Sequence, residues 1–293
     1  MDELKIKNKL NLASAFISEG KKLHALQVLN SIIDETDSIE SNLMLAELLN
    51  EMGFEINAKK IFSNLLLQNP DNEEIKFYFA QFLITKKDWF GVVEIFSNDE
   101  NVNPKSLFLV AYSYFMMEDF DLAKKYFISY SKFEKQNELK HEINLFLAKI
   151  EYELNNYNAA LRYAKAAQFI YDDLWELNLI LAKIYYELNM FAHALTGVQK
   201  ALKHNTDDPA VLEYAAKIYF YLDDFKKAKK YFSKFIDSGV PVSAEVYTML
   251  ANTLMKFGEL EKANSYFDLA LLDDPTYNPA ITGKYDLNKK VLS

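Results

Sequence analysis

The stretch LAKIYYELNMFAHALTGVQKA at residues 181–201 is one of three closely similar stretches in this chain. Residues 147–167 read LAKIEYELNNYNAALRYAKAA, and residues 215–235 read AAKIYFYLDDFKKAKKYFSKF, so each copy lies 34 residues from the next. Alanine, lysine and aromatic residues return to the same places in all three. A fixed period of this length is typical of proteins built from stacked structural repeats.

The alanine near the start of this stretch recurs along the whole chain. Successive copies are separated by between 31 and 37 residues, at Ala13, Ala46, Ala80, Ala111, Ala148, Ala182, Ala216 and Ala251. A second small residue follows each of them by 12 positions, at Ala25, Ala58, Val92, Ala123, Ala160, Ala194, Ala228 and Ala263. Two antiparallel helices can approach closely only where their side chains are small, so we expect these residues to mark helix crossings.

Each unit has the pattern of two amphipathic helices joined by a turn. In the last unit, Tyr247, Leu250, Ala251 and Leu254 have the i, i+3, i+4, i+7 spacing of one helical face. A residue type that tolerates turn conformations then interrupts the pattern. Six units have such a residue at this place: Gly20, Gly53, Asn155, Asn189, Asp223 and Gly258.

The last unit, AEVYTMLANTLMKFGELEKANSYFDLALLDDPTY at 244–277, resembles the 34-residue pattern of the tetratricopeptide repeat family. Tyr247 stands for the usual tryptophan, Ala251 for glycine and Leu254 for tyrosine. Leu250, Gly258, Ala263, Phe267, Ala270 and Pro275 also fit the pattern. The resemblance implies an all-α fold, a right-handed superhelical α-solenoid of antiparallel helix pairs.

We expect residues 1–293 to form a single solenoid of eight units. Their approximate ranges are 6–38, 39–72, 73–103, 104–140, 141–174, 175–208, 209–243 and 244–277. Unit three is short, and unit four is extended through KFEKQNELK (132–140), about one extra helical turn. Residues 278–293 are expected to form a C-terminal capping helix, which the open end of a solenoid requires. The alternative is a frayed tail, because Gly283 interrupts this segment.

Composition excludes several classes of function. The chain has no cysteine, which excludes disulfides and thiolate chemistry, and its 42 acidic and 33 basic residues give a net charge of −9. An acidic chain is a poor candidate for nucleic-acid binding. No apolar run approaches a membrane span, and the charged stretch at 1–16 lacks the apolar core of a secretory signal. We therefore expect a soluble, cytoplasmic protein without nucleic-acid binding or membrane insertion.

Catalytic and metal-binding motifs are absent from the sequence. It contains no Gly-rich phosphate loop, no His-Glu zinc pattern and no nucleophile elbow, so we expect no enzyme activity, no metal and no cofactor. Paired acids recur at the unit junctions, at Asp172-Asp173, Asp207-Asp208 and Asp273-Asp274. They could suggest acid–base catalysis, but we predict that they cap helix N-termini, where carboxylates are favoured.

Similarity to tetratricopeptide repeat proteins implies that the first helix of each unit lines a concave groove. Two features stand out at the groove positions: aromatic residues in units three to seven, and a row of lysines in units five to seven. The predicted peptide-binding residues are Phe77, Tyr78, Phe108, Tyr112, Phe115, Lys149, Tyr152, Lys183, Tyr186, Tyr214, Lys217 and Phe220. Lysine ammonium groups would meet carboxylates of an extended peptide, and the rings would meet its apolar side chains.

Each feature has a competing interpretation. Lys149 and Lys183 could pair with Glu153 and Glu187 four residues on, with Glu151 as a further competitor. The aromatic residues could pack between neighbouring units instead of facing a ligand.

We therefore predict a non-enzymatic interaction scaffold or adaptor. It would bind a partner protein or peptide with acidic and apolar side chains in the concave groove of units three to seven. The first alternative is a structural subunit or self-assembling solenoid that acts through its convex face or ends. The second alternative is the substrate-recruiting part of an enzyme or sensor.

Overall fold

The computed structural model describes residues 2–33, 35–36, 38–97, 102–133 and 140–292. These ranges contain helices and short connections and no strand, which confirms the predicted all-α class. The chain divides into two compact units, unit 1 at Met1–Asn137 and unit 2 at Glu138–Ser293, and each is described by itself. The numerals 1 and 2 denote these compact units, and the eight sequence repeats are numbered in words, from unit one to unit eight.

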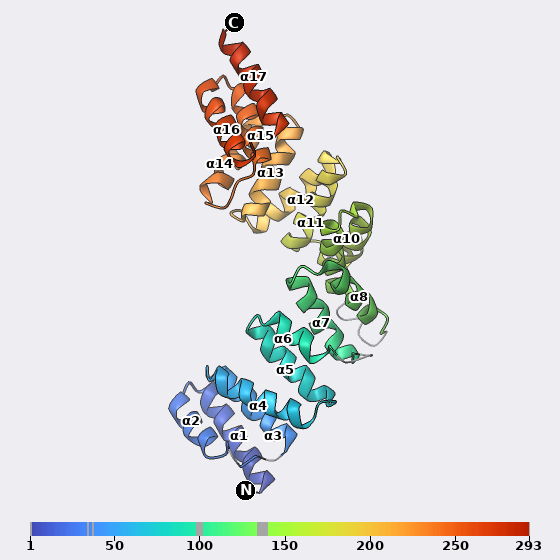
Figure 1. Ribbon diagram of the computed structural model, residues 1–293, viewed down its shortest axis with the longest axis vertical. Coiled ribbons are helices and arrows are strands. Elements are labelled where there is room, and N and C mark those ends of the chain that lie inside the picture. Colours follow the sequence, from blue (N-terminus) through green and yellow to red (C-terminus); the bar gives the residue numbers. More distant parts are fainter. Residues whose placement is uncertain (1, 34, 37, 98–101, 134–139, 293) are drawn as a thin grey trace. The chain divides into compact units, whose positions relative to one another are not determined.

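The described part of unit 1 contains eight helices, which Figure 1 draws. They are α1 (Glu3–Ser18), α2 (Lys22–Asn30), α3 (Ile39–Glu51), α4 (Glu55–Gln68), α5 (Glu73–Thr85), α6 (Trp89–Ile95), α7 (Pro104–Met116) and α8 (Phe120–Ser131). Over residues 140–292, unit 2 contains nine helices. They are α9 (Lys140–Glu153), α10 (Tyr157–Tyr171), α11 (Trp175–Glu187), α12 (Phe191–His204), α13 (Pro209–Tyr221), α14 (Phe225–Asp237), α15 (Ala244–Lys256), α16 (Leu260–Asp273) and α17 (Asn278–Leu292).

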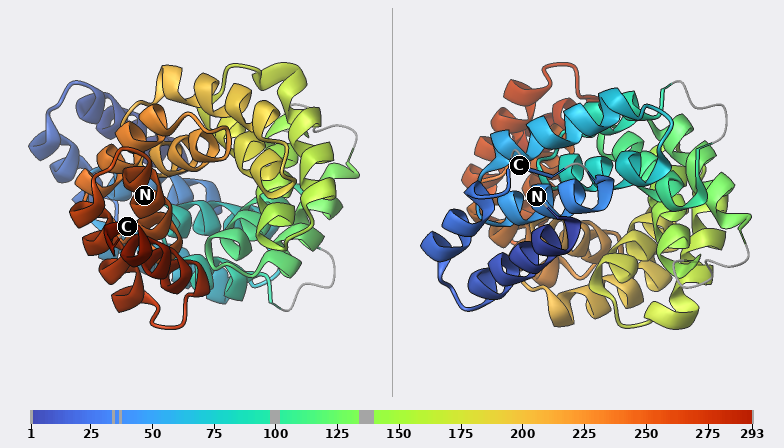
Figure 2. Two further views of the ribbon diagram at one scale, coloured as in Figure 1. Left: turned by 90° about the horizontal axis from the view of Figure 1, so that it is seen from above. Right: turned by 90° about the horizontal axis from the view of Figure 1, so that it is seen from below.

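Consecutive helices form antiparallel pairs, each with a first helix of odd number and a second helix of even number. Within each unit the first helices of successive pairs contact one another, as α9, α11, α13 and α15 do in unit 2. Five second helices pack on the first helix of their own pair and also on that of the next pair, namely α4, α6, α10, α12 and α14. Figure 2 shows the helix pairs of unit 2, from green-yellow to red, following one another along a curve. The first helices therefore form a continuous layer within each unit.

The predicted helix crossings are confirmed. All sixteen small residues of the two series are fully buried, with 0% of their surface exposed. The crossing of α11 and α12 is tight enough to require glycine as well. A Cβ at Gly197 would lie 2.8 Å from the carbonyl oxygen of Asn178 and 3.1 Å from the backbone nitrogen of Ala182.

The turns between paired helices have a left-handed residue at one fixed position. The six predicted turn residues all have positive φ, from 56° at Asp223 to 88° at Gly53. Lys87 (φ 57°) and Glu118 (φ 61°) take the same conformation in the other two units. Each of the eight follows the first alanine of its unit by seven residues, as 87 − 80 and 118 − 111 show. The position within the repeat, and not the residue type, therefore determines where each turn lies.

Polar caps begin several of the first helices. The side chains that accept a hydrogen bond from a backbone N–H of the first turn belong to Ser38, Asn72, Asn103, Asp208 and Ser243. Such a residue satisfies one of the N–H groups that a helix start leaves without an intrahelical partner. The polar junctions between units therefore fix where the first helices begin.

The chain after the last pair is helical as well. Helix α17 packs against α15 and α16, and Gly283 lies at its contact with Phe267. A Cβ at Gly283 would lie 2.5 Å from two ring atoms of Phe267, so only glycine permits this approach. Gly283, which pointed to fraying in the sequence, is a packing residue here. Most of the predicted extension of unit four, residues 134–139, lies outside the described residues.

Candidate functional site

The twelve predicted binding residues all lie on first helices. Five belong to unit 1, on α5 and α7, and seven belong to unit 2, on α9, α11 and α13. Eleven are half-buried and Lys217 is buried. The two sets are described separately.

The rings of unit 1 on α7 contact second helices. The Phe108 ring meets those of Phe127 and Tyr130 on α8 edge-on, at centroid distances of 5.7 and 6.0 Å. Tyr112 meets Trp89 on α6 at 5.7 Å, and Phe115 meets Phe120 at 6.0 Å. These contacts favour the packing interpretation for the α7 rings. Phe77 and Tyr78 on α5 meet each other edge-on at 5.7 Å.

Unit 2 brings lysines and tyrosines from three helices together in the tyrosine–lysine cluster, which comprises Tyr152, Lys183, Tyr186, Tyr214 and Lys217. The hydroxyls of Tyr152 and Tyr214 are 2.7 Å apart. Lys183 Nζ lies 5.8 Å from the Tyr152 ring centroid and 5.2 Å from that of Tyr214. Lys217 Nζ lies 5.4 Å from the Tyr214 centroid and 6.0 Å from that of Tyr186. These distances allow each ammonium group a favourable interaction with two aromatic faces.

Lys217 is neutralised within the chain. Its Nζ lies 2.7 Å from a carboxylate oxygen of Glu213 and 2.6 Å from one of Glu245. Burial disfavours the charge of Lys217, but the two carboxylates outweigh this effect and raise its pKa. Lys217 is therefore a packed, doubly paired cation, and it has little capacity left for a ligand.

Lys149 and Lys183 differ from Lys217 in this respect. Neither forms an ion pair with any described residue, so the anticipated pairs with Glu153 and Glu187 are not formed. The Glu187 carboxylate lies 3.4 Å from the Tyr152 hydroxyl, which donates to it. Lys149 Nζ lies 5.8 Å from the Phe146 ring centroid. Burial lowers the pKa of Lys149, and the charge of Lys183 adds to this effect against the opposing charge of Glu176.

Glu151, the third candidate partner of the lysines, is buried on α9. Its carboxylate accepts a hydrogen bond of 3.0 Å from the Asn156 side chain at the following turn. This contact gives Glu151 a structural role at the turn between α9 and α10.

The two positions that supply carboxylates to Lys217 hold uncharged residues around Lys183: Leu179 lies four residues before it, and Ala210 lies at the unit junction. Glu245, which pairs with Lys217, is the second residue of unit eight, 28 residues on (245 − 217). The second residue of unit six is Glu176, 27 residues after Lys149 (176 − 149). The corresponding residue of unit seven is Ala210, 27 residues after Lys183 (210 − 183). Sequence reasoning missed Glu245, although its place in the repeat could have identified it.

The hydroxyls of the cluster are held in their protonated form. Burial is the main cause that raises the pKa values of Tyr152, Tyr186 and Tyr214 far above their usual range. Burial also raises the pKa of Glu187, although Tyr152 donates to its carboxylate. The surface around Lys183 therefore offers hydroxyl groups and one ammonium group without an anion.

A cleft of about 650 Å³ lies nearby in the same unit, between α13, α15 and α17. Its apolar lining includes Phe220, Tyr221, Phe225 and Met255. Its charged lining consists of Asp223, Lys256, Asp286, Lys289 and Lys290. Phe220, predicted as a binding residue, thus lies in an open cleft with room for an apolar side chain.

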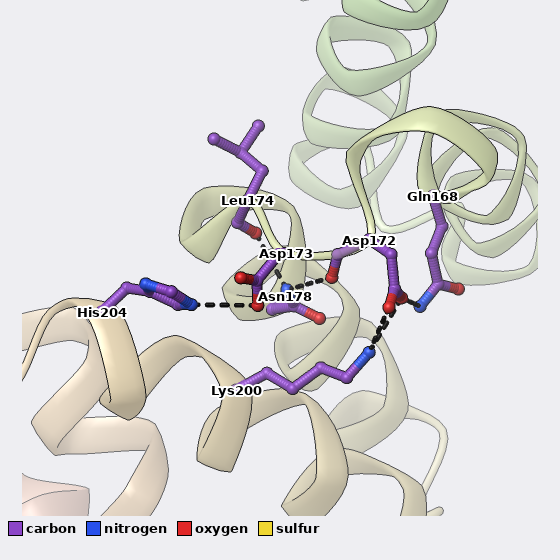
Figure 3. A network of polar contacts seen from close by, with 7 residues as sticks. All are labelled: Gln168, Asp172, Asp173, Leu174, Asn178, Lys200 and His204. Carbon is purple, nitrogen blue, oxygen red and sulfur yellow. Dashed lines mark hydrogen bonds and ion pairs between the residues drawn. The ribbon is translucent and has the colours of Figure 1, made fainter.

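The paired acids have structural partners, and the capping prediction is correct only in part. Asp208 caps α13 by accepting from the Val211 N–H at 3.0 Å. Asp172 instead binds Lys200 at 2.8 and 2.9 Å and Gln168 at 3.0 Å (Figure 3). Asp173 lies 2.9 Å from His204 of α12 (Figure 3). The first pair therefore ties one helix pair to the next instead of capping α11.

The last acid pair agrees with the prediction in one of its two residues, since Asp273 serves a helix start. Asp273 accepts from the backbone N–H of Ala244, at the start of α15, at 2.8 Å. Asp274 accepts from the N–H of Thr276 at 2.8 Å within its own turn. These contacts account for the carboxylates without an acid–base role.

Two further findings concern metals and membranes. Over the described ranges, His, Asp and Glu side chains nowhere gather in a group of three or more that could hold a metal ion. In the same ranges, every helix is too short or too polar to cross a lipid bilayer.

Comparisons with known proteins agree with the repeat pattern. A tetratricopeptide repeat family model matches residues 214–279. Curated proteins gave no match to the sequence. Among solved structures, the chain resembles the APC/C hetero-tetramer Cut9–Hcn1, with a TM-score of 0.60 and 15% identity. That match covers 98% of this chain and 57% of the other, so the chain spans little more than half of that relative.

Two bacterial structures are also similar. A tetratricopeptide repeat protein from Parabacteroides merdae gives a TM-score of 0.55 at 13% identity, covering 85% of this chain and 98% of that one. The pilF protein of Pseudomonas aeruginosa gives 0.58 at 14% identity, covering 73% and 97%. At such identities these structures show the fold alone. Taken with the internal repeat and the helix pairs, they show that the chain has the helical-solenoid fold of tetratricopeptide repeat proteins, and residues 214–279 match the model of that family.

Proposed function

We propose that the chain is a non-enzymatic scaffold or adaptor that holds an extended segment of a partner protein on the first-helix layer of unit 2. The fold supports a role in protein interaction. The sequence predicted a groove over the repeats three to seven, and the proposed surface is limited to the helices α9, α11 and α13. The reason is that the aromatic rings of α7, in compact unit 1, contact second helices.

The observation that carries this proposal is the ammonium group of Lys183, which forms no ion pair within the described ranges. Its neighbour Lys217 has Glu245 at 2.6 Å, whereas the matching place beside Lys183 is taken by Ala210. A half-buried cation without an anion is electrostatically incomplete. A carboxylate from a partner would complete it in the way that Glu245 completes Lys217, and the nearby tyrosine hydroxyls could donate to the partner's backbone.

The preference for apolar side chains rests on a second feature. The cleft beside Phe220 lies on the same unit and has aromatic and methionine walls with charged residues around them. Such a site suits an apolar anchor residue with polar groups at its rim. The proposed partner segment therefore carries a carboxylate for Lys183 and an apolar side chain for this cleft.

The sharpest test supplies the missing carboxylate from within the chain. Ala210→Glu places an acid where Glu245 stands relative to Lys217, and it leaves Lys183 in place. We expect partner affinity to fall by at least about tenfold, equivalent to about 1.4 kcal/mol. Stability should change little, because Ala210 is in the first turn of α13, where an acid is favoured by the helix dipole.

The matched control is Ala192→Glu. Ala192 is exposed and is likewise the second residue of its helix, but it lies on the second helix α12. Partners would be captured from extract of the source cells with the native chain and both variants, and compared by quantitative mass spectrometry. Equal capture by all three proteins would refute the role of Lys183. Loss with Ala210→Glu alone, and binding that weakens with salt in the native chain, would support it.

A second candidate function is that of a structural subunit that assembles through its C-terminal end. Leu272 on α16 is 79% exposed, and Tyr285 and Ile281 on α17 are 60% and 46% exposed. One similar structure is described as a hetero-tetramer. Sedimentation at increasing concentration tests self-assembly, with Tyr285→Lys expected to reverse it. The cytoplasmic location is also part of the proposal, and imaging a fluorescent fusion tests it.

A further inference from the structure

A small cleft lies between α3 and α5 on the first-helix layer of unit 1. Its volume is about 210 Å³, several times the roughly 30 Å³ that one water occupies in the liquid. The cleft therefore has room for the head of one long side chain. Its polar lining includes Glu47, Asn50 and Gln81, and its rings belong to Phe62, Tyr78 and Phe82.

Hydrogen-bond acceptors in this cleft lack partners. Over the described ranges, Glu47 forms neither an ion pair nor a hydrogen bond, and the Asn50 Oδ1 atom is buried without a hydrogen-bond donor. Burial alone raises the pKa of Glu47, which agrees with a carboxylate that no cation approaches. The residue as a whole is exposed, so Glu47 stands at the rim with its carboxyl partly shielded.

Lys86, the residue that follows α5, is already paired. Lys86 Nζ lies 5.6 Å from the Phe82 ring centroid, but it forms an ion pair of 2.6 Å with Glu55. Lys86 is thus not available to Glu47 as a free cation.

One repeat position holds the acidic Glu47 in compact unit 1 and the basic Lys183 in compact unit 2. Glu47 follows Ala46 by one residue, as Lys183 follows Ala182 in unit 2. A site that lacks an anion in unit 2 therefore has a counterpart in unit 1 that lacks a cation. Aromatic rings line both sites.

We propose that the α3–α5 cleft binds a cationic side chain, arginine or lysine, of an extended partner segment. The inference rests on the proposed function in taking first helices as binding surfaces, and it extends that role from unit 2 to the first-helix layer of unit 1. The guanidinium or ammonium group donates to the Glu47 carboxylate and to Asn50 Oδ1. The faces of Tyr78 and Phe82 pack against the same group, an arrangement that suits the planar guanidinium of arginine best.

The test uses the full chain and two small probes that differ in charge. N-acetyl-arginine amide carries the guanidinium, and N-acetyl-citrulline amide is its neutral analogue of nearly the same shape. Binding is followed by NMR through the side-chain amide signals of Asn50 and Gln81, which are assigned by substituting each in turn. We expect saturable shifts of both signals with the arginine probe and none with the citrulline probe.

Charge variants of α3 identify the acceptor. Glu47→Gln should weaken binding of the arginine probe by about tenfold, since the charge-assisted hydrogen bond is lost. Glu51→Gln removes the same charge from an exposed residue on the same helix, outside the cleft, and should leave binding unchanged. Asn50→Asp adds a carboxylate within the cleft and should strengthen binding.

Several outcomes would overturn the inference. They are equal shifts with both probes, no shift with either probe, or unchanged binding by Glu47→Gln. The variant Ala210→Glu in unit 2 should leave the arginine probe unaffected. A chain that loses its partner in Ala210→Glu but binds no arginine probe would overturn this inference and leave the proposed function standing. A chain that binds the arginine probe but keeps its partner in Ala210→Glu would overturn the proposed function and leave this inference standing.

Discussion

Three lysines at one repeat position have three different electrostatic environments. Lys217 is buried between two carboxylates, Lys149 is attracted by Glu176 without an ion pair, and Lys183 has no anion. The lysine row was visible in the sequence, but its division into paired and unpaired members was not. That division depends on contacts within a helix and across unit junctions together, since Glu176 stands at the junction position for Lys149 without forming an ion pair.

The paired and unpaired lysines should respond differently to truncation of their charge. Lys217→Met leaves Glu213 and Glu245 without their cation, so we expect the free energy of unfolding to fall by about 2 kcal/mol. This is less than the 3–5 kcal/mol typical of fully buried pairs, because both glutamates are partly exposed. Lys183→Met removes no ion pair and should cost under about 1 kcal/mol. Chemical denaturation of both variants checks this, and equal losses would contradict the distinction.

The raised pKa of Glu187 predicts a pH-dependent effect on stability. The carboxyl faces Tyr152, Lys217 and Glu245, and burial is the main cause that raises its pKa. The folded chain then holds this proton more tightly than the unfolded chain. Its contribution to stability is present below the unfolded pKa, about 4.3, and is lost as pH rises through the folded pKa.

Glu187→Gln should therefore become more stable relative to the native chain as pH rises through this window. The difference should level off once the native carboxyl is fully ionised. Denaturation of both proteins over a pH series measures it, and the lowest pH, where both side chains are neutral, serves as the internal reference. A difference that does not change with pH would show that burial of Glu187 does not affect folding.

At the scale of elements, the turn within each helix pair has the same backbone conformation in all eight units. Glycine, asparagine and aspartate identified six of these turns in the sequence. Lys87 and Glu118 were missed because they are unusual at positive φ, although both stand seven residues after their alanine. The packing of the alanines at the crossings fixes the place of the turn, and the residue there must adopt the left-handed conformation.

Replacing these two residues with glycine should stabilise the chain. A non-glycine residue in the left-handed region costs about 1–2 kcal/mol, and glycine costs about 0.5–1 kcal/mol in unfolded-state entropy. We expect Lys87→Gly and Glu118→Gly each to raise the free energy of unfolding by up to about 1 kcal/mol. The control is Lys165→Gly, at an exposed position inside α10, and this variant should be less stable than the native chain. Thermal or chemical denaturation distinguishes the two effects.

The junctions between helix pairs were harder to predict than the pairs themselves. Helix pairs follow from local periodicity, so Ala182 and Ala194 located their crossing correctly. The partners of Asp172 and Asp173, Lys200 and His204, lie about 30 residues on along the chain (200 − 172 = 28 and 204 − 173 = 31). Sequence spacing does not specify which of several exposed charges meet across such a junction, and the capping interpretation failed there for this reason.

At the scale of the whole molecule, a repeat array is stabilised by contacts within units and between neighbours. Within each compact unit, the helix pairs of the described ranges pack mainly on their adjacent pairs. Whether residues 1–293 fold as the single solenoid expected from the sequence therefore depends on how far a local disturbance spreads.

Ala182→Leu is suited to measure this spread. Leucine at the α11–α12 crossing should overpack it at a cost of about 1–3 kcal/mol, because Gly197 and Ala194 leave no room there. We expect amide hydrogen exchange, followed by mass spectrometry, to accelerate in α11 and α12 and less in α9, α10 and α13. Exchange in α1 to α4 should be unchanged, since nearest-neighbour coupling decays along the array. Ala192→Leu, at an exposed site on α12, is the control. Acceleration of equal size in both units would instead show that the whole chain unfolds as one cooperative body.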